Sequence, residues 1–212
     1  FVSDKFLPQA VALDASLTVS VPKMSTAFTG IDALSHAVEA YIGLFAPSFR
    51  KDKQMGRHAA KKIFSYLRTT CEEPQNITAR EKMQKASYEA GIAFRRIGTG
   101  YIHAIAHRLG EYYHIPHGKA ISAVFTTVLQ AMLPYGEKEM AKLATYCGIS
   151  DSGDNSVDAN KLIEAIEQLI SDIGIDNSDI VVKDEDLQDI VLRSQEEAKL
   201  TGCPRPFSDD EV

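Results

Sequence analysis

The spacing of apolar side chains changes near the start of the chain. Gln9–Leu13 (QAVAL) is a short apolar run closed by Asp14, a pattern typical of one buried strand. From Pro22 onward apolar residues recur every three to four positions, which predicts helices. A lone strand leaves its own backbone groups unpaired. We therefore expect residues 1–21 to be a strand and linker left over from a neighbouring unit, and residues 22–212 to form a helical domain.

The helical part of the chain divides into about seven or eight segments, which predicts an all-α, multi-helix bundle. Gly43 is a plausible stop for the first helix, and Pro74 follows the second. Gly98 and Gly100 separate the third helix from the fourth, and Thr78–Glu81 (TARE) has the pattern of a capping box. The expected helices are Ser25–Tyr41, Lys51–Cys71, Thr78–Arg96, Tyr101–Tyr113, Lys119–Leu133, Glu137–Tyr146, Val157–Ile173 and Asp184–Leu200.

Composition narrows the classes of function. The net charge of −6 and the pI near 5.5 disfavour a nucleic-acid partner, because such proteins usually carry a basic excess. No apolar run approaches the roughly 20 residues that span a bilayer, and the opening residues lack the pattern of a secretory signal. Cys71, Cys147 and Cys203 are too few and too widely spaced for a disulfide framework or a Cys-rich zinc site. A reducing cytoplasm is the simplest location.

Histidine placement is the feature that points to chemistry. Asp32 and His36 lie four residues apart in TGIDALSHAVEAY, so on a helix their side chains share one face. His103 and His107 repeat this spacing in a later helix, and His117 follows within the same fifteen-residue stretch. Imidazole and carboxylate groups without thiolate suit Zn²⁺, Fe²⁺ or Mn²⁺. Four such ligands would leave coordination positions open for a substrate oxygen, which is typical of a catalytic metal site.

The spacing of these histidines does not by itself decide which of them bind the metal. On one continuous helix His117 would lie about 21 Å beyond His103, but Gly110 and Pro116 between them allow the chain to break and return. The ligands then converge only if the two helices pack face to face. Spacing alone does not decide whether His103 or His107 is the ligand. The two further histidines, His58 and His114, are expected to be structural or surface residues.

Two strings resemble the signatures of the iron-dependent (group III) alcohol dehydrogenases. They are TGIDALSHAVEAY and GTGYIHAIAHRLGEYYHIPHG, and the preceding DASLTVSVPKMSTAFTG is similar to the family's lead-in to the first. The resemblance implies that Asp32, His36, His103 and His117 are ligands of a divalent metal, which is generally Fe²⁺ in this family and Zn²⁺ in some members. It also implies that His107 lies beside the nicotinamide, as a catalytic proton relay or a cofactor-binding group.

The same resemblance implies a larger enzyme than the sequence shows. Members have an N-terminal α/β nucleotide-binding domain, bind NAD or NADP and commonly form homodimers. The strand near Val11 would be the last strand of that missing domain, and this chain alone would be inactive. The implied reaction is metal-assisted hydride transfer between an alcohol and NAD(P), with a small alcohol or aldehyde as substrate.

Two departures from the family pattern are visible. Lys119–Ala123 (KAISA) replaces the small-Asn-small run that usually follows PHG, and residues 98–100 (GTG) lack the third glycine of a dinucleotide fingerprint. Three alternatives stay open: a zinc-dependent glycerol dehydrogenase, a relative of dehydroquinate synthase, and a helical metal-binding module without catalysis. A longer parent chain with a Gly-rich segment upstream would dismiss the third.

Overall fold

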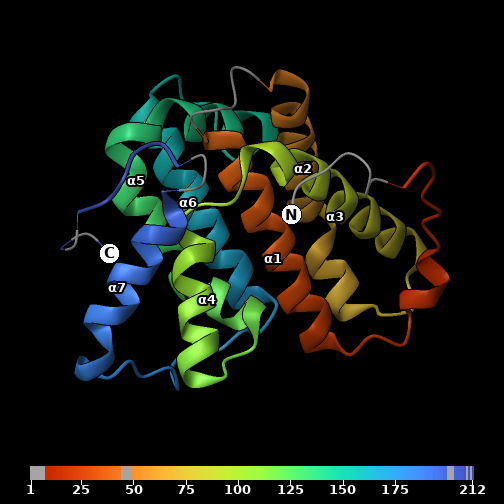
Figure 1. Ribbon diagram of the computed structural model, residues 1–212. Helices are drawn as coiled ribbons and strands as arrows, with labels where there is room; N and C mark the ends of the chain where they lie inside the picture. Colours follow the sequence, from red (N-terminus) through yellow and green to blue (C-terminus); the bar gives the residue numbers. More distant parts are fainter. Residues whose placement is uncertain (1–7, 44–48, 200–202, 209, 211) are drawn as a thin grey trace.

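The computed structural model describes residues 8–43, 49–199, 203–208, 210 and 212, and the secondary structure found within them is helical (Figure 1). No helix in these ranges is both long and apolar enough to cross a membrane. The all-α bundle expected from the sequence is confirmed. Its elements are η2 (Ala15–Thr18), α1 (Lys23–Ile42), α2 (Arg50–Glu72), α3 (Ile77–Ile97), α4 (Tyr101–Tyr113), α5 (His117–Cys147), α6 (Asn155–Asp172) and α7 (Asp184–Ala198).

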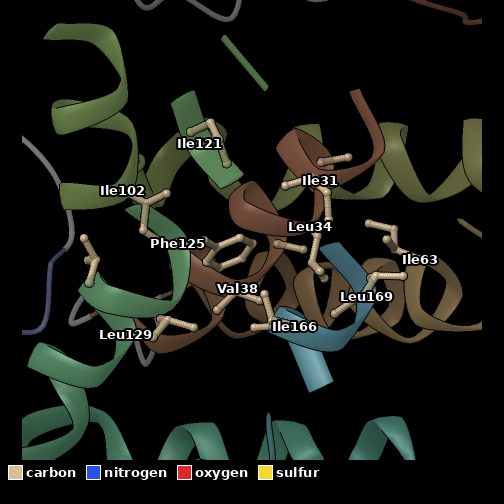
Figure 2. Close-up of a cluster of buried hydrophobic side chains, with 14 of the residues drawn as sticks. Ile31, Leu34, Val38, Ile63, Ile102, Ile121, Phe125, Leu129, Ile166 and Leu169 are labelled. Carbon is tan, nitrogen blue, oxygen red and sulfur yellow. The ribbon is translucent and has the colours of Figure 1, made fainter. Parts of the chain in front are cut away.

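Helix α1 lies at the centre of the bundle and packs against α2, α3, α4 and α5. Helix α6 covers α5, and α7 lies beside α4. Figure 2 shows Val38 of α1 beside Phe125 of α5 and Ile166 of α6, all within one continuous core. Burying each such side chain stabilises the fold by about 1.5–3 kcal/mol. The helix that carries Asp32 and His36 is therefore held from several sides.

The strand expected at Gln9–Leu13 is not formed. This segment has no regular secondary structure, and Val11 and Leu13 are exposed. The described part of the chain offers no neighbouring strand, so the backbone groups of the segment have no ladder to join. The chain instead enters η2 at Asp14, whose carboxylate accepts a hydrogen bond from the Ser16 backbone N–H, and η2 packs on α3.

Helix α3 begins earlier than the capping-box pattern indicates. Its N-cap is Asn76, whose side-chain oxygen accepts a hydrogen bond of 3.0 Å from the Ala79 backbone N–H. Thr78 lies inside the first turn, so the capping box expected at Thr78–Glu81 is wrong. Asparagine is as strong an N-cap as the sequence could offer there, and it precedes the threonine by two residues.

The two helices expected at Lys119–Leu133 and Glu137–Tyr146 are one helix, α5, which continues through Pro134. A proline inside a helix removes one hydrogen bond and crowds the preceding turn, at a cost of about 3 kcal/mol. Leu129 and Met140, on either side of the proline, are both fully buried. Packing of this long helix against α1, α4 and α6 outweighs the local cost.

Candidate metal centre

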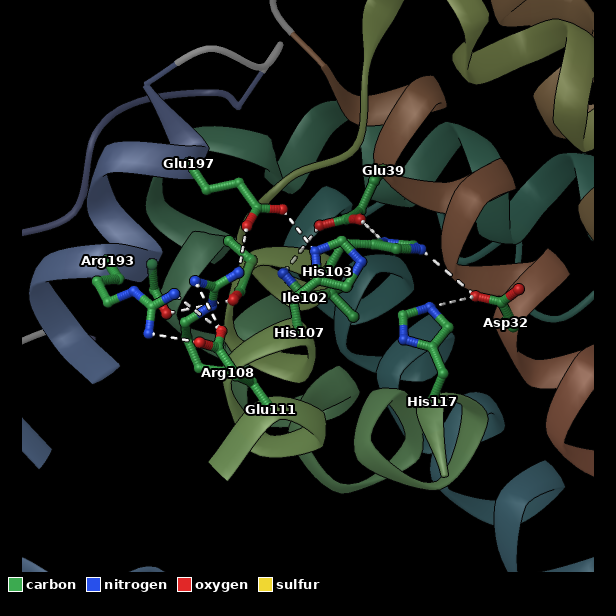
Figure 3. Close-up of polar contacts among 12 residues, drawn as sticks. Asp32, Glu39, Ile102, His103, His107, Arg108, Glu111, His117, Arg193 and Glu197 are labelled. Atoms are coloured by element: carbon green, nitrogen blue, oxygen red, sulfur yellow. Dashed lines mark hydrogen bonds and ion pairs between the residues drawn. The ribbon is translucent and has the colours of Figure 1, made fainter. Parts of the chain in front are cut away.

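Four side chains from α1, α4 and α5 meet at one place, and Figure 3 shows three of them, Asp32, His103 and His117. Asp32 and His36 point the same way because they lie one turn apart on α1. Asp32 Oδ1 lies 3.4 Å from Nε2 of His103, on α4, and 3.2 Å from Nε2 of His117, on α5. The other carboxylate oxygen of Asp32 lies 3.8 Å from His36 Nδ1. The structure thus brings together the four residues that the sequence singled out as candidate ligands.

The turn between α4 and α5 returns His117 toward the cluster. Helix α4 ends at Tyr113, and His114 adopts the left-handed conformation with φ of 53°. Pro116 then caps α5, so that His117 is the first residue of that helix. Gly110, one of the two expected break points, lies inside α4, and the reversal comes from the turn that follows it.

Gly118 allows α5 to start this close to α1. A Cβ atom at this position would lie 2.4 Å from the backbone carbonyl oxygen of Phe28, far closer than real contacts allow. Only a glycine lets the first turn of α5 touch the backbone of α1. This close approach places the neighbouring His117 next to Asp32.

The cluster fits a divalent cation. Asp32, His36 and His103 each offer one ligand atom, and these atoms lie within 4.8 Å of one another. Asp32 Oδ1 and His103 Nε2 are buried and make no hydrogen bond within the described part of the chain. Buried polar atoms rarely go without a partner, and a cation bound to one carboxylate and several imidazoles would satisfy both.

The charges of the cluster are strongly coupled. Burial would raise the pKa of Asp32, but His103 and His117 face its carboxylate and hold that pKa well below its usual range. Burial and the nearby His103 lower the pKa of His36 to about 4. Burial would also lower the pKa of His103, yet the carboxylates of Asp32 and Glu39 raise it to about 9. A bound cation would therefore displace a proton from His103 at neutral pH.

Glu39 belongs to this site, although the sequence analysis did not single it out. Its buried carboxylate places Oε2 2.6 Å from His103 Nδ1, and Oε1 accepts a hydrogen bond of 2.9 Å from the Ile102 backbone N–H. A signal was available, because Asp32, His36 and Glu39 follow one another at helical spacing in one string. A glutamate on the buried face of a helix needs a partner inside the protein.

His107 lies one turn after His103 on α4 and faces a different carboxylate. Its Nδ1 is 2.6 Å from Oε1 of Glu197, on α7, and its ring stacks on that of His117 with centroids 5.2 Å apart. Arg108 donates a hydrogen bond of 3.1 Å to the other oxygen of Glu197. The geometry therefore favours His103 over His107 as the residue that faces Asp32.

The other two histidines lie apart from the cluster's ligand atoms. His58, on α2, stacks on Tyr146 with ring centroids 5.8 Å apart. His114 is exposed in the turn before α5. A further aromatic residue that the sequence analysis missed, Phe94 of α3, stacks on His36 with centroids 4.2 Å apart. Phe94 thus covers the cluster on the side of α3.

The chain is similar in sequence to dehydrogenases of small alcohols. The family model for the C-terminal part of Fe-containing alcohol dehydrogenases matches residues 26–212. The chain is 42% identical to 1-propanol dehydrogenase PduQ of Salmonella typhimurium, over 76% of this chain and 44% of that protein. It is 35% identical to 1,3-propanediol dehydrogenase of Klebsiella pneumoniae, over 100% of this chain and 55% of that protein. The chain thus spans about half the length of the curated relatives it matches.

Solved structures show the same fold. A 1,3-propanediol oxidoreductase superposes with a TM-score of 0.87 at 34% identity, over 93% of this chain and 52% of that one. Sulfoacetaldehyde reductase from Bifidobacterium kashiwanohense, solved in complex with NAD+, superposes with a TM-score of 0.84 at 31% identity, over 99% of this chain and 54% of that one. By both sequence and fold, the chain belongs to the iron-containing alcohol dehydrogenase family and represents its C-terminal, helical domain.

Proposed function

We propose that this chain is the metal-binding half of an NAD(P)-dependent dehydrogenase that interconverts a small alcohol and its aldehyde. The observation that carries the proposal is the buried pair formed by Asp32 Oδ1 and His103 Nε2, which face each other without a hydrogen bond among the described residues. The names of the similar proteins, which act on 1-propanol and 1,3-propanediol, support the substrate class.

The proposed metal ligands are Asp32, His36, His103 and His117, with Fe²⁺ as the expected ion and Zn²⁺ as the alternative. When bound, such an ion supplies a Lewis acid that polarises the oxygen of an alcohol or aldehyde. His103 closes the cluster toward the core, whereas His117 and Asp32 are partly exposed. A small substrate would approach the ligands from this exposed side.

His107 is the proposed proton carrier and cofactor neighbour. It lies beside His117 at the open side of the cluster, and Glu197 holds its Nδ1. This contact leaves Nε2 of His107 available to exchange a proton with the reacting hydroxyl group or with water. The resemblance to the family supports a position next to the nicotinamide ring.

The proposal includes a second domain that the sequence does not contain. Because the relatives are about twice as long, we propose that an α/β domain for NAD or NADP precedes residues 22–212, with residues 1–21 linking the two. The polypeptide with both domains is called the complete protein below. We also propose that it is a cytoplasmic homodimer and that the present chain alone does not turn over substrate. If the reading frame that encodes this chain contained no nucleotide-binding segment, the proposal of a second domain would be wrong.

Metal content and substrate oxidation test the proposal. Elemental mass spectrometry of the anaerobically purified complete protein should find about one iron or zinc per chain. His103→Ala and His117→Ala should lose this metal, whereas His58→Ala, a control outside the cluster, should keep it. The wild-type protein should reduce NAD+ or NADP+ with 1-propanol or 1,3-propanediol. No metal in the wild type would refute the site, and metal without turnover of any alcohol would favour a non-catalytic module.

A further inference from the structure

We infer that Glu39 is a positioning residue of the metal site, because its carboxylate decides which ring nitrogen of His103 carries the hydrogen. The inference deepens the proposed function and rests on it. Its content is specific: Glu39 keeps a hydrogen on Nδ1, so that Nε2, on the side of Asp32, is the nitrogen left to bind the metal.

The contacts of Glu39 determine which ring nitrogen of His103 donates a hydrogen bond. Each carboxylate oxygen has one partner, since Oε1 accepts from the Ile102 backbone N–H and Oε2 lies 2.6 Å from His103 Nδ1. An ionised carboxylate can only accept hydrogen bonds. His103 must therefore donate from Nδ1, and its Nε2 is directed at Asp32 Oδ1, 3.4 Å away. Figure 3 shows His103 between these two carboxylates.

The start of α4 accommodates this carboxylate. A Cβ atom at Gly100 would lie 2.6 Å from Oε1 of Glu39, so a larger residue there would push the side chain away. The backbone N–H groups at the N-terminus of a helix stabilise a negative charge. Gly100 and the first turn of α4 thus favour an anion at the one place where an anion fixes the orientation of His103.

A glutamine in place of Glu39 separates this role from a merely structural one. Its side-chain oxygen would accept from the Ile102 N–H, because the opposite orientation would set two donors against each other. Its amide NH₂ would then donate to His103 Nδ1 and force the ring hydrogen onto Nε2. That hydrogen points at Asp32 and can bond to it. The metal-free protein would keep its hydrogen bonds, but a metal could bind Nε2 only if the ring hydrogen moved to Nδ1, where it would face the amide donor.

The test measures metal affinity of the complete protein by chelator competition, with Fe²⁺ under anaerobic conditions and with Zn²⁺. Glu39→Gln should weaken both affinities by about 10- to 100-fold, as removal of such outer partners does at metal–histidine sites, while the melting temperature of the metal-free protein changes little. The matched control is Glu89→Gln. This buried glutamate pairs with Lys62 at 2.6 Å, and its replacement should leave both affinities unchanged.

A second measurement does not depend on the variant. Nitrogen-15 spectra of the zinc-loaded wild-type protein should show His103 with a hydrogen on Nδ1. A His103 ring without that hydrogen would overturn the inference. Wild-type metal affinity in Glu39→Gln would overturn it as well. Either result would leave the proposed metal site intact. A wild-type protein that binds neither ion would overturn the proposed function and the inference together.

Discussion

Two histidine–carboxylate pairs lie one helical turn apart on α4, with the same geometry and different surroundings. The Nδ1 atoms of His103 and His107 are each 2.6 Å from a carboxylate oxygen, of Glu39 and Glu197 respectively. The side chains of the first pair are each 2% exposed, whereas those of the second are 41% and 29% exposed. The two pairs therefore differ in burial and not in distance.

Burial decides how firmly each pair is held. No water can replace a partner in the buried pair, so His103 and Glu39 fix each other's state. Water competes at the exposed pair, and such contacts contribute only about 0–1 kcal/mol to stability. A metal ligand benefits from a fixed orientation, while a proton carrier such as the one proposed at His107 needs access to solvent. The same local motif can thus serve two tasks on one helix.

The largest expected effect comes from removing one carboxylate at a time. Glu39→Ala leaves His103 Nδ1 and the Ile102 N–H without an acceptor in the core, which should cost about 3–5 kcal/mol of unfolding free energy. Glu197→Ala should cost about 1 kcal/mol or less. Denaturant unfolding of the metal-free protein measures both values. Equal losses would show that burial does not distinguish the pairs.

A smaller effect is expected at His117, whose ring lies 5.5 Å from that of His103 and 5.2 Å from that of His107. Gly118→Ala would force the start of α5 away from α1, at a cost of about 1–3 kcal/mol. The shift would move His117 from Asp32 and weaken metal binding, measured by chelator competition.

The matched control for this change is Gly91→Ala, also within a helix. A Cβ atom at Gly91 meets no atom within 4 Å. Alanine is the better helix former, so this variant should be as stable as the wild type or more stable. Equal metal affinity in Gly118→Ala and Gly91→Ala would mean that the close approach of α5 does not position His117.

Helical spacing in the sequence predicted the all-α fold, and it predicted that the first two candidate ligands lie on one face of a helix. Asp32 and His36 share a face by the period of the helix. Spacing could not choose between His103 and His107, since that choice depends on how α4 is rotated about its axis. The rotation is set by packing of α4 between α5 and α7, and the partner Glu197 comes from a residue 90 positions away.

The errors of prediction have the same physical origin. The sequence analysis expected a break between Leu133 and Glu137, but buried side chains on both sides of Pro134 hold α5 together. The apolar run at Gln9–Leu13 has strand character, yet a strand forms only beside another strand. In each case the local preference of the sequence is overridden by packing, or by the lack of a packing partner. Neither can be recognised from a short stretch of sequence.

The pH dependence of stability should separate the pairs further. The folded protein raises the pKa of His103 from its ordinary 6.5 to about 9, so it binds this proton more tightly than the unfolded chain does. The resulting stabilisation is complete below about pH 6.5 and is lost as the pH rises toward 9. Glu39→Gln removes one carboxylate that raises this pKa. The unfolding free energy of this variant should therefore decline less with rising pH than that of the wild type, whereas Glu197→Gln should decline as the wild type does. Unfolding free energies of the metal-free protein between pH 6 and 9 test this, and equal slopes in the two variants would contradict it.

The smallest effect is expected from Glu197→Gln in the complete protein. Glutamine can still bond to His107, and water reaches this pair, so stability and metal content should match the wild type. Turnover of 1-propanol should fall by only about three- to tenfold, in kcat more than in KM, because His107 loses a fixed orientation but not its ability to exchange a proton. Glu196→Gln, at the exposed neighbouring position, is the control and should change neither constant. If Glu197→Gln kept the wild-type kcat, the exposed pair would be a surface contact without a role in turnover. Burial alone would then account for the whole difference between the two pairs.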